Sequence, residues 1–398
     1  MGPRIKVVLN ESYHSAGTRT APQMKTELQT TIVDSFEELD GWADQWDELV
    51  ERMPQKLAVL SHAWIRSFLQ HRMGRSERWI CVLAHHDDVL QGVLPLIVQR
   101  RRVGPIPVLV LSTPFDWHTV SSDCTVKMGC EHEVIPVLIR EGLRHVPQAL
   151  WLEMRRLPEE SPTLQIDFKD FGLPFDQQED GPGAIYPTVG DFDTYFEGLS
   201  GSFRRKLRRA DRGLKQELGN EPRLEVVTEN PQERFEALLD LEASGWKGDR
   251  GSAIKCSDSL AAFYRDLVNN LARRGWLELY LLTCGSSLLA GSLGIRIADA
   301  VTLAKTSYDE SFRKHSPGNV ARLEIIRRAF HDNGVSYLDG LSMASYHGNW
   351  NVGARSYRHL WVFRPGLKGN LLGRMPHRLR NWARTQNWLR RLLRKAEK

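Results

Sequence analysis

The sequence predicts an α/β (α+β) protein made of two tandem modules of one design, each a mixed, mostly antiparallel sheet flanked by helices. The first observation is a repeated order of elements: helix, strand, strand, strand, helix, strand occurs twice, about 197 residues apart. The second is a shared pattern in which a Trp opens an apolar run, a polar turn follows, and the next apolar run contains a Gly. Because few residues are identical, chance similarity of two amphipathic stretches is the alternative.

One hairpin is predicted in each half. The first half reads "RWICVLAHHDDVLQGVLPLIVQRRR", with Trp79 and Gly92, and the second reads "GWLELYLLTCGSSLLAGSLGIRIADAV", with Trp276 and Gly291. Two apolar runs joined by a short polar turn are typical of antiparallel strands.

The elements around each hairpin follow from apolar spacing. Apolar residues three and four apart precede each Trp, at 64–69 and at 263–271, and predict a helix there. After each hairpin we expect a strand ("IPVLVLST" and "AVTLAKTSY"), a helix (about 131–146 and 318–332) and a short strand ("ALWLEM" and "SYLDGL").

Length and composition limit the class of protein. A chain of 398 residues suggests two or three domains of ~150 residues each, and 41% hydrophobic with 26% charged residues is a globular composition. No apolar run approaches the roughly 18 residues that cross a bilayer, and the amino end lacks a secretory signal. Five scattered Cys, none in a CxxC pair, favour neither disulfides nor a zinc site. We expect a soluble or peripheral protein of the reducing cytoplasm.

Changes in composition predict the domain boundaries. Acidic residues, Gly and Pro replace apolar periodicity near residues 173–187, which suggests a linker. The predicted division is a disordered lead-in (1–30), a first module (31–172), a linker (173–190), a second module with a helix-rich insert near its start (191–364) and a basic tail (365–398).

Basic residues are concentrated in the tail. Residues 364–398 contain eleven Lys or Arg against Glu397 alone, so they carry +10 and the rest of the chain −5. Trp382, Trp388 and several Leu fall near one helical face beside arginines, a pattern typical of an interfacial membrane helix. A helix docked on the protein and a nucleic-acid arm are the alternatives.

A helix start in the second half is the first candidate site. In "SFRKHSPGNVARLEIIRRAF" two basic residues, Arg313 and Lys314, precede Ser316-Pro317-Gly318. Ser316 can cap a helix, and Gly318 lets a ligand approach the backbone. Because a helix start exposes unpaired N–H groups, it favours a phosphate. The alternative is that Ser-Pro-Gly only starts a helix. The first half has no matching turn, so we expect a single cofactor site.

A Gly-rich break is the second candidate. "LLDLEASGWKGDRGSAI" begins as a helix and then loses helical continuity, so Trp246 and Lys247 fall on an irregular segment of the kind that lines clefts. Glu242 can take a proton from an acceptor, and Tyr308 can return one to a leaving thiolate. A solvated helix end with Trp246 as a packing anchor is the alternative.

A strongly basic segment is the third candidate. In "SFRRKLRRADRGLK", residues 202–215, seven Lys or Arg accompany one Asp, and an apolar stripe predicts a helix with basic outer faces. It can bind phosphate-rich ligands, anionic glycans or RNA, or it can be simply a solvated charged helix. By contrast, the chain has no nucleophile elbow, Walker loop or dinucleotide fingerprint, and its His residues form no metal-ligand pattern.

The runs "GSFRRKLRRADRGL", "LDLEASGWKGDRGSA", "LLAGSLGIRIADAVTLAKTSYDESFRKHSPGNVARLEIIRRAF" and "VSYLDGL" resemble the CelD/BcsL-type proteins of the GNAT acyltransferase superfamily, relatives of the FemAB-like tandem GNAT proteins. The resemblance spans roughly residues 35–364. It implies two GNAT-like modules, acyl transfer, and a place in exopolysaccharide (for example cellulose) or cell-envelope synthesis. It also implies that Arg313 to Val320, including Asn319, receive the diphosphate of an acyl-CoA. Where the family commonly has Tyr-Lys, this chain has Tyr346-His347, followed by Trp350.

These observations lead to one functional hypothesis. We expect an acyltransferase that moves an acyl group from acyl-CoA, acetyl-CoA first, to an amine or hydroxyl of a sugar or lipid-linked saccharide, without a metal. Glu242 is the first choice of base, followed by Asp309 and Asp339, and Tyr308 is the acid. Lys247 and Lys305 are candidates for oxyanion or acceptor contacts. The expected substrate contacts are Trp246, Lys305, Asp339, Tyr346 and Trp350.

Two other functions stay open. A Fem-like aminoacyl transferase would take its donor from charged tRNA and hold the RNA with the basic 203–215 helix. A non-catalytic module would tether envelope-synthesis enzymes at the inner face of the cell membrane through its tail.

Overall fold

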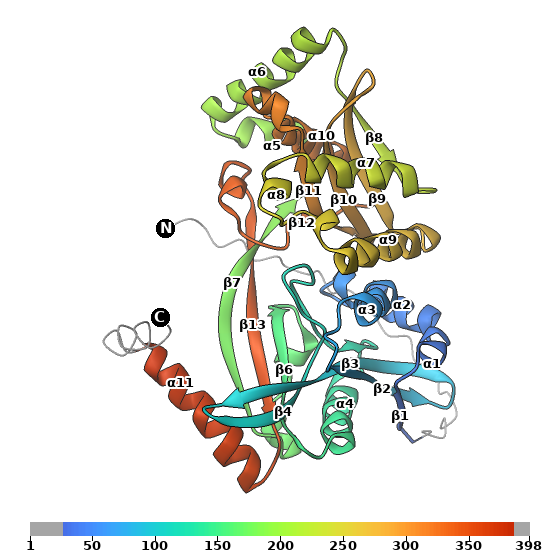
Figure 1. The fold of residues 1–398 in the computed structure, drawn as a ribbon, viewed down its shortest axis with the longest axis vertical. Coiled ribbons are helices and arrows are strands. Elements are labelled where there is room, and N and C mark those ends of the chain that lie inside the picture. Colours follow the sequence, from blue (N-terminus) through green and yellow to red (C-terminus); the bar gives the residue numbers. More distant parts are fainter. Residues whose placement is uncertain (1–26, 386–398) are drawn as a thin grey trace, which may run out of the picture.

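A computed structural model describes residues 27–385; residues 1–26 and 386–398 lie outside the described part. Most of the expected lead-in therefore lies outside it, and its last residues enter β1 (Gln29–Val33). In the described chain thirteen strands form one sheet, in the order β1-β2-β3-β4-β6-β13-β7-β12-β11-β10-β9-β8, with β5 paired to β3. The sheet joins a blue-to-green half to a yellow-to-orange half (Figure 1).

The first half follows the predicted order of elements. Its helices are α1 (Phe36–Asp40), α2 (Ala43–Arg52), α3 (His62–His71) and α4 (Glu131–His145). Its strands after β1 are β2 (Arg78–His86), β3 (Val89–Val103), β4 (Ile106–Ser112), β5 (Thr125–Val126) and β6 (Ala149–Pro158).

The second half repeats this order. Its helices are α5 (Phe192–Gly198), α6 (Gly201–Leu218), α7 (Gln232–Ala243), α8 (Trp246–Asp249), α9 (Asp258–Arg273) and α10 (Pro317–His331). Its strands are β8 (Arg223–Val227), β9 (Leu277–Cys284), β10 (Ser287–Ile297), β11 (Ala300–Tyr308) and β12 (Tyr337–Asp339). The two longest strands outside this repeat are β7 (Phe175–Pro187) and β13 (Gly353–Phe363).

Each half contains an antiparallel hairpin followed by a parallel pair. β4 lies parallel to β6, and β11 lies parallel to β12. The helix between the two strands of each pair, α4 or α10, buries an apolar face, because Leu, Ile and Val recur at helical spacing. The predicted fold class, two mixed modules flanked by helices, is thus confirmed.

The two modules exchange strands at the centre of the sheet. β7, which follows the first module in the chain, pairs with β12 of the second, and β13 pairs with β6 of the first. β7 and β13 then pair with each other (Figure 1). The segment 173–190, which we expected to be a linker, therefore holds a long strand. Its acidic and Gly-rich sequence concealed this strand, because its pairing partners lie far away in the chain.

The helix-rich segment before the second hairpin differs from the expected insert. β8 pairs with β9 as β1 pairs with β2. The segment 191–272 thus contains a strand in the place that β1 occupies in the first half, and α5 and α6 precede it.

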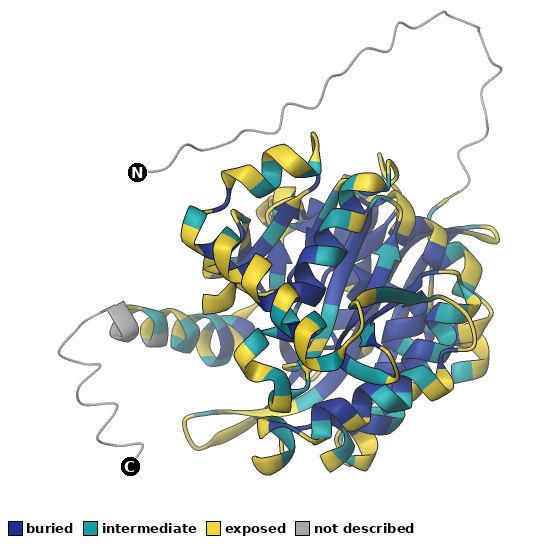
Figure 2. Ribbon diagram, turned by 90° about the horizontal axis from the view of Figure 1, so that it is seen from above, coloured by how far each residue is buried: buried dark blue, intermediate teal, exposed yellow. Residues whose placement is uncertain are grey.

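The core extends across both modules. Trp64 of α3 and Phe263 of α9 meet edge to face, with ring centroids 5.7 Å apart. The hydroxyl of Ser67 donates to Asp266 (2.8 Å), and Arg274 pairs with Asp47 (2.7 Å). Buried strands lie between helices whose outer faces are exposed (Figure 2). No helix in residues 27–385 is long and apolar enough to span a bilayer.

The described part of the tail is helical. A π-helical segment (Gly369–Arg374) leads into α11 (Met375–Thr385). Leu372 packs against the cluster of Val108, Val110 and Leu150, and Arg378 pairs with Asp176 (2.9 Å). The first part of the tail is therefore docked on the N-terminal half, and residues 386–398 lie outside the described chain.

Candidate functional site

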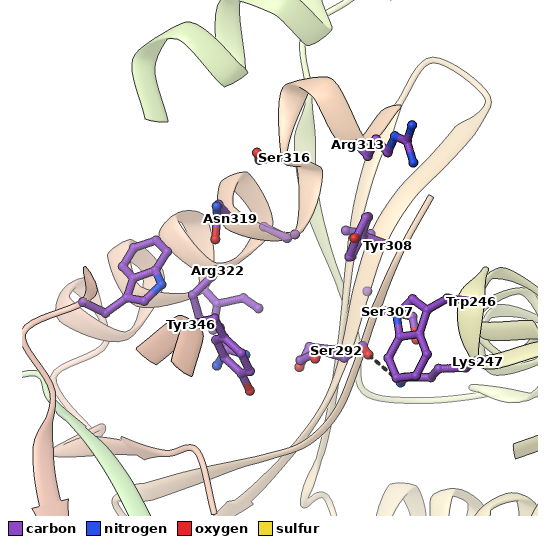
Figure 3. Close-up of a pocket in the computed structure, with 17 residues that line it drawn as sticks. Trp246, Lys247, Ser292, Ser307, Tyr308, Arg313, Ser316, Asn319, Arg322 and Tyr346 are labelled. Carbon is purple, nitrogen blue, oxygen red and sulfur yellow. Dashed lines mark hydrogen bonds between the residues drawn. The ribbon is translucent and has the colours of Figure 1, made fainter. Parts of the chain in front are cut away.

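A cavity opens where β11 separates from β12. The parallel pairing covers only residues 300–302 of β11, whereas β11 continues to Tyr308. The cavity has a volume of about 410 Å³. Its walls come from β10, β11, α8, the start of α10 and the loop that follows β12. Trp246 and Lys247 approach from one side and Arg322 and Tyr346 from the other (Figure 3).

A β-bulge shapes the strand wall of the cavity. Leu293 of β10 faces Lys305, but the next residue, Gly294, faces Leu303, so Ala304 is an extra residue in β11. Beyond the bulge, the Ser292 hydroxyl donates to the carbonyl of Lys305 (3.0 Å). The strand residues that line the cavity are Ala290, Gly291, Ser292, Thr306, Ser307 and Tyr308.

The first turn of α10 closes one end of the cavity, and Arg313 lines the same end. Ser316 occupies the N-cap position, but its backbone is left-handed (φ +46°) and its side chain makes no capping hydrogen bond. We expected Ser316 to cap the helix; an N-cap side chain does so from an extended backbone, which Ser316 lacks. Its side chain lines the cavity, as Gly318 and Asn319 do. A Cβ at Gly318 would lie 3.4 Å from the Tyr308 ring, so Gly318 keeps the approach to the helix start open.

Lys247 is held in the opposite wall by two acceptors. Its Nζ donates to Glu242 Oε1 (2.7 Å) and to the carbonyl of Thr306 (3.2 Å). The second oxygen of Glu242 accepts the backbone N–H of Ile254 (2.9 Å). The backbone N–H of Trp246 donates to Glu310 (3.0 Å), which fixes the start of α8 beside β11.

Most of the predicted binding residues meet at this cavity. The predicted residues that line it are Trp246, Lys247, Tyr308, Arg313, Ser316, Gly318, Asn319, Tyr346 and Trp350. They come from four separate segments of the chain. Every charged side chain in the lining is a cation (Lys247, Arg313 and Arg322), so this cavity suits an anionic ligand.

Glu242 and Lys305 lie next to the cavity and do not line it. Glu242 is 6% exposed and faces a small adjoining hollow that Tyr308 and Lys247 also line. Lys305 extends toward α9, with its Nζ 5.5 Å from the centre of the Tyr264 ring. Burial, assisted by the charge of Lys247, lowers the pKa of Lys305 to about 8.

Four other predicted site residues contact the protein itself and do not face the cavity. Asp309 accepts the N–H of Ser311 (2.9 Å), and Lys314 pairs with Glu217 (2.9 Å). Val320 lies on the buried face of α10, in the cluster that contains Leu289. Asp339 is buried in an ion pair with Arg355 (2.5 Å). None of the four lines the main cavity.

Sequence reasoning missed Ser292, Ser307 and Arg322. Arg322 follows Gly318 by four residues, so helical spacing alone puts both on one face of α10. That signal was available in the sequence. The two Ser residues have no comparable local signal, because their position depends on the strand register beside the bulge.

The matching corner of the first module is closed. α4 begins after Cys130 with Glu131 and Glu133 in its first turn, and these acidic groups repel anions. A Cβ at Gly92 would lie 2.5 Å from Cγ1 of Val134, so α4 packs directly against β3. Among the described residues, no group of three or more His, Cys, Asp or Glu is arranged to hold a metal ion.

Residues 201–347 match the acetyltransferase (GNAT) domain family. This segment is therefore similar to GNAT-type acetyltransferase domains, and the match covers less than half of the chain. It contains α6, the cavity strands and α10, so all the residues that line the cavity except Trp350 lie within it. No curated protein matches the sequence significantly.

Solved structures extend the likeness of fold to both modules. A crystal structure of FemX has a TM-score of 0.55 at 12% identity and covers 83% of this chain and 98% of its own. A conserved protein of unknown function from Bacteroides thetaiotaomicron VPI-5482 has a TM-score of 0.53 at 13% identity and covers 84% of this chain and 100% of its own. The predicted GNAT-type, FemAB-like fold is confirmed, and the closer relation to the CelD/BcsL type stays a prediction.

Proposed function

We propose that the GNAT domain transfers an acyl group from acyl-CoA, acetyl-CoA first, to an amine or hydroxyl of a saccharide acceptor used in envelope or exopolysaccharide synthesis. The observation that carries the proposal is the single cavity that connects the start of α10 to Tyr308 and Lys247. One space can therefore hold both a donor and an acceptor, and holding reactants together accounts for much of the rate of such reactions.

The donor would bind with its diphosphate at the helix start. Arg313 supplies a charge. In the first turn of α10, Pro317 has no N–H and the N–H groups of Asn319 and Val320 donate to the Ser316 carbonyl, so the N–H of Gly318 is left for a phosphate. The Ser316 hydroxyl makes no capping hydrogen bond and lines the same space. The thioester end of the donor would extend along the unpaired edge of β11.

The chemical step would use Tyr308 and the Glu242–Lys247 pair. The acceptor nitrogen or oxygen forms a bond to the thioester carbonyl carbon, and the C–S bond breaks. Tyr308 gives its proton to the leaving thiolate, and Glu242 takes the acceptor proton through the hollow that it shares with Tyr308. Lys247 would stabilise the oxyanion of the tetrahedral intermediate.

Aromatic side chains support a sugar acceptor. Trp246 and Tyr346 line the cavity and are 46% and 47% exposed, so their surfaces are available to a ligand. Trp350 lies deeper, 1% exposed, with its ring 4.9 Å from that of Phe203. A sugar ring can pack against such apolar faces while its hydroxyls meet the polar strand residues.

The test is acetyl-CoA binding by calorimetry, followed by thiol release with a panel of amino sugars. We expect saturable binding that weakens in Arg313→Met, and release of CoA that depends on the sugar. Arg358→Met is the matched control, because Arg358 lies on β13 outside the cavity. Absence of acetyl-CoA binding to the folded wild-type protein would overturn the donor assignment.

Aminoacyl transfer from charged tRNA is the second candidate function. A basic groove between α6 and the start of α10 shares Ser316 with the cavity, so RNA in this groove would reach the donor end. The Lys and Arg residues in its lining are Lys206, Arg209, Arg212, Lys215 and Lys314, and His315 lies beside them. Steep salt dependence of tRNA binding, lost in Arg209→Gln with Arg212→Gln, would favour this function. Equal activity with and without ribonuclease would exclude it.

Membrane association through the tail is a further part of the proposal. Leu367, Leu371, Met375, Leu379 and Trp382 recur about one helical turn apart and are each more than half exposed. Their neighbours include Lys368 and Arg378. Apolar side chains flanked by cations suit an anionic lipid surface.

Vesicle sedimentation tests this part. We expect binding to phosphatidylglycerol vesicles, weaker binding to phosphatidylcholine, and loss of both in Leu371→Ser with Leu379→Ser. Deleting residues 374–398 distinguishes an enzyme from a non-catalytic tether. A soluble transferase should keep its turnover in vitro without the tail, whereas a non-catalytic tether shows no turnover with or without it.

A further inference from the structure

Arg322 is a buried cation without a protein anion. It lies in the second turn of α10, is 6% exposed and lines the cavity. Its Nη1 is buried and has no hydrogen-bond partner. Its guanidinium lies over the ring of Tyr186, with Cζ 5.5 Å from the ring centre. Among the described residues no carboxylate forms an ion pair with it.

A second buried arginine shows the usual arrangement. Arg355 has a side chain that is 4% exposed, and it pairs with Asp339 (2.5 Å) and Glu160 (3.3 Å). An arginine cannot lose its proton under ordinary conditions, so a buried one needs a counter-charge. Arg355 finds that charge inside the protein, and Arg322 does not.

The groups around Arg322 are neutral or already engaged. Burial raises the pKa of Tyr186 to about 12, so its hydroxyl keeps its proton. Burial, and then the charge of Arg322, lowers the pKa of His347 to about 4, so the imidazole is neutral near neutral pH. The hydroxyl of Tyr186 and Nδ1 of His347 form a hydrogen bond of 2.6 Å. Glu324 on the same helix pairs with Arg327 (2.7 Å). The missing charge must therefore come from the cavity.

Arg322 lies away from the place proposed for the donor diphosphate. It lies one helical turn, roughly 5.4 Å along the axis, beyond Gly318, whose N–H is left without an acceptor at the helix start. Its side chain lies near Tyr346, on the side of the cavity away from Arg313 (Figure 3). If the diphosphate of a CoA thioester binds at the helix start, the pantetheine arm that passes deeper carries no charge.

We propose that Arg322 binds a carboxylate or phosphate group of the acceptor, so that this domain acylates an acidic acceptor. The inference deepens the proposed function and rests on it for the place of the donor. The planar guanidinium presents paired donors that match a carboxylate or a phosphate. Trp246 and Tyr346 would contact the uncharged part of the same molecule.

Calorimetry with small anions tests the site without turnover. Inorganic phosphate and acetate are the probes for the two kinds of anion, and acetyl-CoA is the probe for the donor. The variants are Arg322→Met, which keeps an unbranched side chain like the apolar stem of arginine and removes the charge, and Arg313→Met as the matched control at the helix start.

We expect Arg322→Met to weaken the binding of phosphate or acetate by about tenfold or more and to leave acetyl-CoA affinity within about twofold. Arg313→Met should weaken acetyl-CoA by about tenfold or more and leave acetate affinity within about twofold, whereas inorganic phosphate can also bind at the helix start. If Arg322→Met weakens acetyl-CoA as much as Arg313→Met does, the anion belongs to the donor and the proposal is overturned. Wild-type affinity for both small anions in Arg322→Met would also overturn it.

Thermal unfolding of the ligand-free protein is the second measurement. Because Arg322 is buried without a partner, Arg322→Met should unfold at the same temperature as wild type or higher, while Arg355→Met should unfold at a lower temperature. A loss of stability in Arg322→Met equal to that in Arg355→Met would make Arg322 a structural residue and overturn the proposal. Failure of acetyl-CoA to bind wild type would count against the proposed function, because neither the small-anion nor the unfolding result uses the donor.

Discussion

Lys247 connects Glu242 to the edge of β11: its ammonium group lies 2.7 Å from the carboxylate and 3.2 Å from the carbonyl of Thr306. Both oxygens of Glu242 are engaged, one by Lys247 and one by the N–H of Ile254. The carboxylate is therefore held in one orientation behind the cavity wall. Whether it acts as a base or only positions Lys247 can be decided by kinetics.

We expect Glu242→Gln to lower kcat by about 10²-fold or more and to leave the KM for acetyl-CoA unchanged, because the amide cannot take a proton. Initial rates of Glu242→Gln, Lys247→Met and the double variant measure the coupling of the pair. If the two residues act as a unit, the loss in the double variant is smaller than the product of the single losses. A folded Glu242→Gln with full turnover would remove Glu242 from the base role.

Tyr308→Phe should lower kcat by about 10²-fold, because the leaving thiolate loses its proton donor. Tyr308 is 39% exposed, so the melting temperature should stay near that of wild type. Tyr346→Phe is the control for the loss of a tyrosine hydroxyl from the cavity. It removes the hydroxyl on the other side of the same cavity and keeps the ring. Equal rates for Tyr308→Phe and wild type would exclude the acid role.

Ser316→Gly should separate stability from binding. Glycine adopts the left-handed backbone of residue 316 without steric cost, so we expect the free energy of unfolding in urea to rise by about 1 kcal/mol. Loss of the hydroxyl should at the same time weaken acetyl-CoA. A variant that gains stability and binds acetyl-CoA with unchanged affinity would show that the Ser316 side chain does not contact the donor.

The free energy of unfolding of the wild-type protein should rise with pH above about pH 8, because of Lys305. The folded pKa is about 8 and the unfolded value is 10.5, so between these values the unfolded chain binds more protons and wild-type stability rises with pH. Lys305→Met should therefore be more stable than wild type near neutral pH, by on the order of 3 kcal/mol. Urea unfolding across this range should show the difference shrinking toward pH 10.5. A constant difference would contradict the lowered pKa.

The strand exchange predicts that neither half folds alone. A fragment that ends at residue 190 lacks β13, and the remaining fragment lacks β7, so β6 and β12 would each lose a neighbour. We expect each fragment to be insoluble when expressed singly and the two to form one soluble complex when co-expressed. Size-exclusion chromatography checks this, and a monodisperse single fragment would contradict it.

Elements with strong local signals could be predicted from the sequence. The helix expected at about 318–332 is α10 (Pro317–His331), and the run "AVTLAKTSY" is β11. Both are specified by apolar periodicity and by the turns beside them. β7 could not be predicted this way, because its polar sequence becomes a strand only through pairing with β12 and β13.

The site could be predicted where its residues are close in sequence. Arg313, Ser316 and Gly318 line one cavity because a single turn brings them together. The partners of Glu242 and Asp339 could not be predicted, because Lys247 and Arg355 reach these carboxylates only after the chain has folded. A carboxylate in a sequence has the same appearance whether it faces a ligand or an arginine.

The reciprocal crossing of β7 and β13 also bears on how the chain arose. The central order β4-β6-β13-β7-β12-β11 reads the same from either end when each strand is replaced by its counterpart in the other module. Such an arrangement is what gene duplication and fusion give when the ancestral subunit is already a homodimer that swaps its last strand. A duplication of this kind would give two equal pockets, whereas here the pocket of the second module is open and Val134 and Leu138 of α4 pack against Gly92 in the first.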